Sequence, residues 1–177
     1  MNAPLSHNYN LGRLGNAGDE VRIEADEAQC TAIAAMAGAL SLSRFAATLV
    51  LTKSAPDKFL LSCRLEADVT QACVVTLEPV AAHVERAFSR ELHFTGTGRR
   101  PAAGSDPESQ ELSLDEGEET EEIESLHYDL AGPLLEEFLL ALDPYPRCPG
   151  VEFDPAQVAP VPPESPFAAL KSLKSSK

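Results

Sequence analysis

The side chains of this 177-residue chain that could hold a metal or act as nucleophiles are four cysteines and four histidines, all far apart in the sequence. The cysteines form no Cys-x-x-Cys pair, whereas a zinc site needs about four nitrogen or sulfur ligands at suitable spacing. Cys73 and Cys148 would supply two ligands, and His127 at most a third. We therefore predict that the chain binds no metal. Cys63 and Cys73 share the inward phase of one expected strand, which favours small buried core residues.

Motifs for catalysis are absent from the sequence. It contains no phosphate-binding glycine loop, no nucleophile elbow and no His-Glu-x-x-His metal helix. His83 and His93 would lie on one strand face together with Glu85 and Glu91, and such a polar face is typical of the solvated side of a sheet. We therefore predict surface histidines and a protein that is not an enzyme and uses no cofactor.

The net charge of −14 comes mainly from one segment. Residues Asp106 to Glu124 contain ten carboxylates and no base, whereas residues 1–105 contain 11 acids and 10 bases. Such a run is usually a solvated linker, but it can also mimic nucleic acid and hold a basic partner. Both interpretations stay open from the sequence.

Direct nucleic-acid binding usually shows as a basic stripe with stacking aromatic residues. The best candidates for such a stripe are Arg64, Arg86 and Arg90, followed by Arg99 and Arg100. Arg86 and Arg90 share a strand phase with apolar residues, so they could frame a small basic patch. Simple balance of surface charge explains these arginines at least as well.

The regular elements that must position these residues are mainly strands. Residues 59–69 alternate between apolar and polar side chains, which is typical of a half-buried antiparallel strand, and the phase continues to Leu77 before Pro79. Residues 44–53 alternate in the same way, and the short link 54–58 predicts a hairpin. We expect a third long strand at 83–95, a short strand at 21–25 and an edge strand within 7–14.

Two helices are predicted. The first lies within residues 25–40, where Asp26 can cap the helix, Gln29 can reach back to it, and Gly38 is near the end. The second begins near Gly132, with Pro133 in its first turn, and ends before Pro144. Its predicted buried face is Leu134, Leu135, Phe138, Leu139 and Leu142, and its predicted solvated face is Glu136 and Glu137.

The fold class predicted from these elements is α+β, a single domain of mostly antiparallel strands with two helices. We place the domain at residues 7–146, including a disordered acidic loop at about 96–124. Residues 147–177 form a Pro-rich tail with a short amphipathic end, in which Phe167 and Leu170 oppose Lys171 and Lys174. These four tail residues join Arg64, Arg86 and Arg90 as candidate interaction residues.

The first 20 residues lack a secretory leader and no apolar run is long enough for a bilayer span, so we expect a soluble cytoplasmic protein.

Three pieces of the chain, taken in order and spacing, resemble the YceD-like family of bacterial proteins. The first is Glu66–Cys73 and the residues that follow to Pro79. The second is Tyr128–Leu130 with the helix that ends in Leu140–Pro146. The third is the terminal segment Ser165–Lys174.

Many members of the family carry a Cys-x-x-Cys at the first piece and further cysteines after the second, an arrangement suggestive of zinc. Here Cys73 matches the first cysteine, but Thr76 stands at the second position, which argues against metal and leaves Cys73 and Cys148 as relics.

The resemblance implies support of large-subunit ribosomal RNA accumulation and of ribosome assembly, by binding RNA or a ribosomal protein. The partner would be a large-subunit ribosomal protein or a ribosomal RNA intermediate. The acidic segment favours a basic protein over bare RNA, because ten carboxylates repel phosphate. The alternative is a general acidic adaptor or holding protein for basic clients, with no tie to ribosomes.

Overall fold

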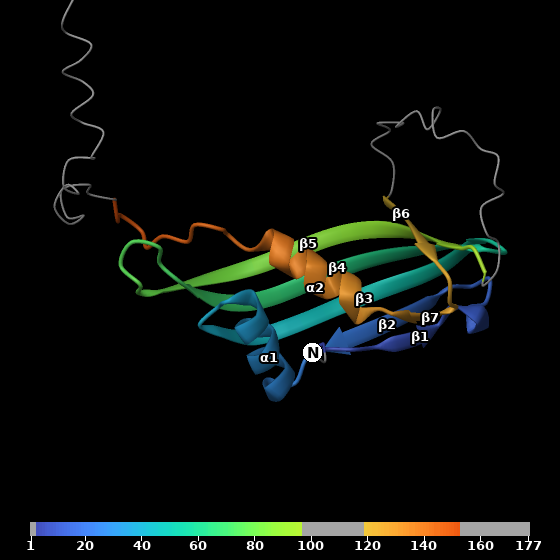
Figure 1. The fold of residues 1–177 in the computed structure, drawn as a ribbon, viewed down its shortest axis with the longest axis horizontal. Coiled ribbons are helices and arrows are strands. Elements are labelled where there is room, and N and C mark those ends of the chain that lie inside the picture. The colour runs from blue at the N-terminus through green and yellow to red at the C-terminus, as the bar shows by residue number, and fades with distance from the viewer. Residues whose placement is uncertain (1–2, 97–118, 153–177) are drawn as a thin grey trace, which may run out of the picture.

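The computed structural model describes residues 3–96 and 119–152, and within them the chain has the α+β fold predicted from the sequence (Figure 1). A five-stranded sheet has the strand order β2-β3-β4-β5-β6, and a separate two-stranded sheet pairs β1 with β7. The strands pair antiparallel, apart from the parallel pairing of β5 with β6. In chain order the elements are β1 (Asn8–Asn10), the 3-10 helix η1 (Leu11–Arg13), β2 (Asp19–Glu24), α1 (Glu27–Ala37), β3 (Ser41–Ala55), β4 (Lys58–Ala72), β5 (Pro79–Phe94), β6 (Glu119–Ile123), β7 (His127–Asp129) and α2 (Ala131–Ala141).

Strands β3, β4 and β5 are three long strands joined by two hairpins. The predicted hairpin after residue 53 is confirmed, since Ala55 pairs with Lys58. The alternation predicted for residues 59–69 is also confirmed, because every second residue of β4 from Phe59 to Val69 is buried. The predicted continuation of this strand to Leu77 is wrong. The chain leaves the sheet after Ala72, because Cys73 N–H donates to Glu78 O at 2.8 Å and closes the turn between β4 and β5.

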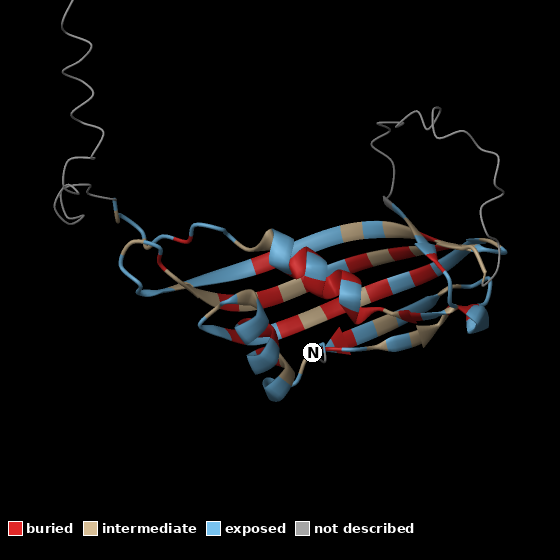
Figure 2. Cartoon of the chain, in the orientation of Figure 1, coloured by how far each residue is buried: buried red, intermediate tan, exposed pale blue. Residues whose placement is uncertain are grey.

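The helices and the small sheet cover one face of the five-stranded sheet (Figure 1). Alternate buried residues on this face appear as red stripes along the strands in Figure 2. Phe138 of α2 packs edge-on against Phe45 of β3, with ring centroids 5.5 Å apart and an interplanar angle of 89°. No described element covers the opposite face, which we call the open face.

An aspartate accepts backbone hydrogen bonds at the start of each helix. For α1 the predicted capping box is present, since Gln29 N–H donates to Asp26 at 2.8 Å and the Gln29 side chain accepts from Asp26 N–H at 2.9 Å. Gly38 ends α1 in the left-handed conformation, at φ 65°. For α2, Asp129 accepts hydrogen bonds from the backbone of Ala131 and His7. Although burial opposes it, these backbone donors lower the pKa of Asp129 below its usual value.

Three further predictions are corrected by the structure. Residues 119–123, placed in the disordered acidic loop at 96–124, form strand β6, while 97–118 lie outside the described residues. β6 is stable next to β5 because Ile123 is buried and the Glu121 carboxylate has hydrogen-bond donors. In α2, Leu134, Leu135 and Phe138 are buried as predicted, but Glu137 is buried and Leu139 is 41% exposed, the reverse of the prediction for these two residues. The N-terminal strand pairs with β7 instead of forming an edge of the main sheet.

The described helices include none that is long and apolar enough to cross a membrane. Of the predicted tail, residues 147–152 are described, and Phe167, Leu170, Lys171 and Lys174 lie outside the described residues.

Candidate interaction surfaces

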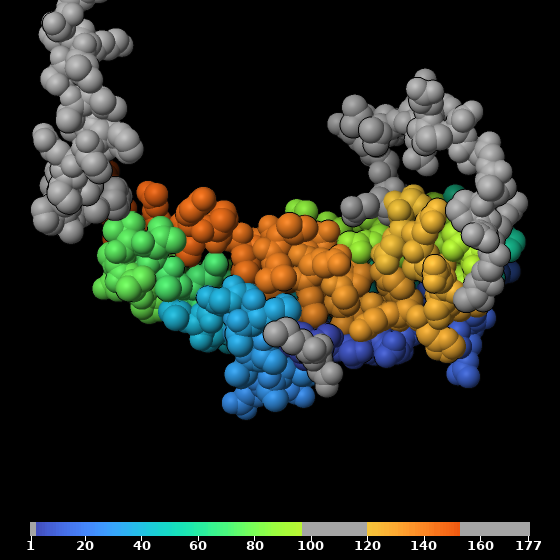
Figure 3. All heavy atoms as spheres, viewed as in Figure 1, coloured from blue at the N-terminus to red at the C-terminus, as the bar shows by residue number. Residues whose placement is uncertain are grey.

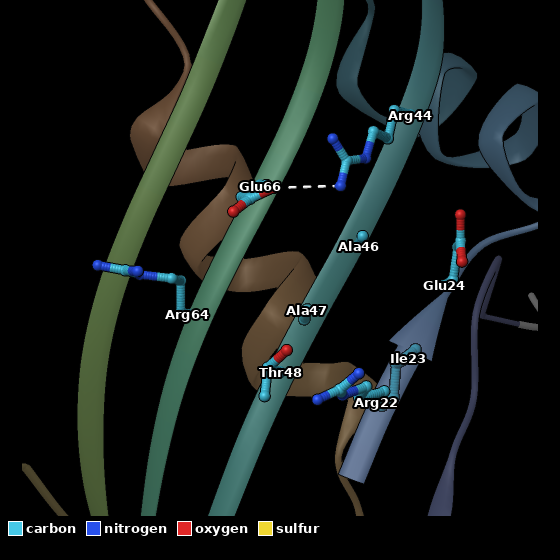
Figure 4. Close-up of a pocket in the computed structure, with 9 residues that line it drawn as sticks. All are labelled: Arg22, Ile23, Glu24, Arg44, Ala46, Ala47, Thr48, Arg64 and Glu66. Carbon is cyan, nitrogen blue, oxygen red and sulfur yellow. Dashed lines mark ion pairs between the residues drawn. The ribbon is translucent and has the colours of Figure 1, made fainter.

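The first candidate surface is a shallow hollow on the open face of the sheet, with a volume of about 250 Å³. Three arginines from neighbouring strands line it: Arg22 of β2, Arg44 of β3 and Arg64 of β4. Arg22 and Arg64 both pair in register with Thr48, so they lie in one row across three strands. Figure 4 shows them on either side of Thr48. The small side chain of Ala46 leaves the space between the arginines open.

Two of these three arginines have carboxylate partners. Arg44 is 3.2 Å from Glu66, as the dashed line in Figure 4 marks, and Arg22 is 2.9 Å from Glu20. Both pairs are largely exposed, so each contributes little to stability. Arg64 has no ion pair among the described residues. The hollow therefore combines nearly balanced charge with one uncompensated guanidinium, which can bind a carboxylate or a phosphate group.

Arg86 and Arg90, the other predicted arginines, lie on the covered face and contact α2. Arg86 Nε donates to Glu137 Oε2 at 2.9 Å. Arg90 donates to Glu121 of β6 at 3.2 Å and to Glu136 of α2 at 3.1 Å. Their positive charges are thus balanced by glutamates within the fold. The structure does not bring them together with Arg64, and a role of these arginines in binding a partner stays a prediction.

A second candidate surface is an apolar end of the molecule, where α1, the β4–β5 turn and the chain after α2 meet. These segments are tied together by Leu40 N–H donating to Thr70 O at 2.8 Å and Val74 N–H donating to Pro146 O at 2.9 Å. A hollow lined partly by Leu142, Pro144 and Pro146 lies here, and Figure 3 shows the three segments in contact. Large apolar residues exposed on these three segments and on a fourth, the last turn of α2, are Met36, Leu40, Val74, Leu77, Leu139, Leu140 and Tyr145.

Sequence reasoning missed the apolar end. Its residues come from four segments, and in each segment the local pattern either marked the residue as buried or gave no signal. The one usable signal was that α2 has more apolar residues than a single buried face can hold, since Leu139 and Leu140 follow Phe138 directly.

The third feature is the pair of cysteines that were interpreted as relics. Cys73 and Cys148 are 75 residues apart, yet Cys148 N–H donates to Cys73 Sγ at 3.4 Å. Thr76 lies between the two thiols, with its N–H 3.5 Å from Cys73 Sγ and its hydroxyl 3.8 Å from Cys148 Sγ. Within the ranges 3–96 and 119–152, no group of three or more His, Cys, Asp or Glu residues is arranged to hold a metal ion. The absence of bound metal itself stays a prediction.

The surroundings of the two thiols change their acidity in opposite directions. Hydrogen bonds from the Thr76 hydroxyl, from Cys148 N–H and from Thr76 N–H lower the pKa of Cys73 to about 6. Partial burial, together with the hydrogen bond and the charge of Cys73, raises the pKa of Cys148. The surroundings therefore favour the thiolate form at Cys73 and the thiol form at Cys148.

The part of the chain from β4 onward matches a known protein family. Residues 61–174 match the family model described as Large ribosomal RNA subunit accumulation protein YceD. The match begins within β4 and includes β5, β6, β7, α2, both cysteines of the pair and the tail up to Lys174. No curated protein and no solved structure matches the chain.

Proposed function

The chain belongs to the YceD family of large ribosomal RNA subunit accumulation proteins, and from that premise we propose that it is a non-enzymatic factor that acts by binding during assembly of the large subunit. Membership of the family implies a role in large-subunit ribosomal RNA accumulation. The observation that carries the proposal is the extent of the match, which covers most of β4, the strands β5 to β7, α2 and the chain beyond it.

The charge arrangement supports a protein partner over bare RNA. RNA binding gains largely from the counterions that lysine and arginine release from phosphates. On the covered face, Arg86 and Arg90 are already paired with glutamates, so they offer little of that driving force. The ten carboxylates between Asp106 and Glu124 add local repulsion toward phosphate and attraction toward a basic surface.

The apolar end supports the same preference. Leu77 and Leu140 are each 76% exposed, and Tyr145 is 70% exposed. Exposed apolar residues can take part in protein contacts, and aromatic residues such as Tyr145 are enriched in protein interfaces. We therefore infer that the partner is a basic ribosomal protein or a protein-coated ribosomal RNA intermediate.

The role in ribosomal RNA accumulation can be tested in a deletion strain. We expect large-subunit RNA to fall relative to small-subunit RNA, and a plasmid copy of the wild-type chain to restore the ratio. A Leu77→Ser/Leu140→Ser copy should restore it poorly, because it weakens the apolar end. A Val50→Ser copy is the matched control, since Val50 is an exposed apolar residue of the open face. An unchanged ratio in the deletion strain would contradict the proposal and favour a general acidic adaptor.

The kind of partner can be tested by pull-down of the tagged full chain before and after nuclease treatment. We expect a basic ribosomal protein to stay bound after the RNA is digested, because the contact is between proteins. The preference for protein is wrong if the ribosomal signal vanishes with nuclease and the purified chain binds naked large-subunit RNA tightly at about 150 mM salt, near physiological ionic strength.

A further inference from the structure

Two segments distant in the sequence hold Cys73 and Cys148 together from both sides. Val74 N–H, next to Cys73, donates to Pro146 O at 2.9 Å. The Gln71 side chain donates to Asp143 O at 3.1 Å. These two hydrogen bonds join the end of β4 to the chain after α2, so the two cysteines are kept close by the backbone around them.

The two cysteines are close neighbours in the fold. Cys148 N lies 3.4 Å from Cys73 Sγ. Because the amide nitrogen and Cβ of one residue are only two bonds apart, the Cys148 side chain starts beside the Cys73 sulfur. Both thiols also contact the single residue Thr76. A disulfide needs Cβ atoms about 3.5–4.5 Å apart, a separation that the backbone sets, and rotation about each Cα–Cβ bond then turns the two sulfurs toward each other.

The environment of the pair also favours oxidation. Hydrogen-bond donors around Cys73 stabilise its thiolate, which is the nucleophilic form of cysteine. Cys73 itself has no exposed surface, whereas Cys148 is partly exposed. Cys73 therefore has the more reactive sulfur, and the partly exposed Cys148 beside it can supply the second thiol. Cys148 also donates weakly toward the Glu78 carboxylate, at 3.9 Å.

The remaining two cysteines provide an internal contrast. Cys30 and Cys63 are both buried. Burial, with a contribution from the charge of Glu137, raises the pKa of Cys63 to about 12, and burial also raises the pKa of Cys30. Neither is ionised at neutral pH, so neither is expected to react.

From this geometry we propose that Cys73 and Cys148 form a site of reversible oxidation, at which a peroxide closes a disulfide between the β4–β5 turn and the chain after α2. The Cys73 thiolate attacks hydrogen peroxide: the S–O bond forms as the O–O bond breaks, and the hydroxide released takes up a proton, so that a sulfenic acid and water result. The Cys148 thiol then attacks Cys73 Sγ and gives up its proton as hydroxide is displaced, and the proton and hydroxide form a second water. Two thiols are oxidised to one disulfide, and one peroxide is reduced to two waters.

The disulfide would change the surface that the proposed function uses. The bond lies beside Val74 and two residues from Pro146, at the edge of the apolar end. It would hold the turn and the following chain in one arrangement, independent of whether the partner is a ribosomal protein. The oxidation site and the proposed function can therefore fail separately.

The test treats the purified full chain with hydrogen peroxide and follows its mass. We expect the intact chain to lose two hydrogens, and denatured free thiols to fall from four to two. Protease digestion should yield one linked peptide pair that contains Cys73 and Cys148, and dithiothreitol should reverse it. Closure should slow as pH falls through about 6, because Cys73 then gains its proton.

Two variants make the test selective. Cys148→Ser should abolish the loss of two hydrogens, and Cys30→Ser should leave it unchanged. The proposal is overturned if Cys73 and Cys148 stay free at peroxide levels that oxidise glutathione, or if the linked peptides contain Cys30 or Cys63. It is also overturned if protein purified without chelators holds one zinc per chain that the Cys73→Ala variant loses, since the pair would then be a metal site.

Discussion

Replacing Phe138 with alanine is expected to lower the free energy of unfolding by about 3–5 kcal/mol, the usual cost of removing a fully buried phenylalanine. Phe138 has no exposed surface, and its ring meets Phe45 edge-on with centroids 5.5 Å apart. An aromatic pair of this kind contributes about 0.5–1.5 kcal/mol beyond the buried area. The substitution would leave a cavity between α2 and the sheet. Urea denaturation, compared at constant m-value, measures the loss.

Leu139→Ala is the matched control for this prediction. Leu139 is the next residue of α2 and is 41% exposed, so its truncation removes less buried surface than the truncation of Phe138. We expect a change within about 0.5–1 kcal/mol, because alanine also favours helix more than leucine does. Equal losses in the two variants would mean that α2 does not pack on the sheet through Phe138.

Replacing Arg90 with methionine is expected to cost about 2–3 kcal/mol. The Arg90 side chain is only 12% exposed and joins Glu121 of β6 to Glu136 of α2. Without the guanidinium, the partly buried Glu121 carboxylate would keep the Tyr128 hydroxyl as a donor, at 2.8 Å, but lose its compensating charge. Glu136 is 63% exposed and can be solvated, so most of the cost comes from Glu121. Chemical denaturation of the full chain measures the difference.

Two further variants separate charge from packing at Arg90. Arg64→Met removes an exposed arginine of the open face and should change stability by less than about 0.5 kcal/mol. Arg90→Met combined with Glu121→Gln should recover about 1 kcal/mol or more, because the unpaired charge is then gone. If the double variant is no more stable than Arg90→Met alone, the loss is due to packing and the charge argument fails.

Local patterns in the sequence were enough to predict most elements. The alternation from Phe59 to Val69 marked the two faces of β4, because successive side chains of a strand point to opposite sides. Asp26 and Gln29 marked the start of α1, because a capping box satisfies free N–H groups within three residues. The resemblance to the YceD family rested on short segments of the same kind. In each case the physical cause and the signal lie in one stretch of chain.

The candidate sites were predicted less completely, because their partners come from distant segments. The strand phase of Arg86 and Arg90 placed them on the apolar side of β5, but only the fold shows that glutamates of α2 and β6 face them. Glu137 was placed on the solvated face for the same reason, since helical spacing does not reveal a basic residue 51 positions away.

The sequence by itself thus determined the fold class, the long strands, the caps of α1 and the family. The tertiary structure alone decided the strand β6, the burial of Glu137, the apolar end and the meeting of Cys73 with Cys148. Periodicity reports whether a side chain points toward a core or toward solvent, because that depends on the geometry of its own element. It does not report which residue stands opposite. The pairing of a buried charge or a thiol depends on that opposite residue, and only the folded chain brings the two together.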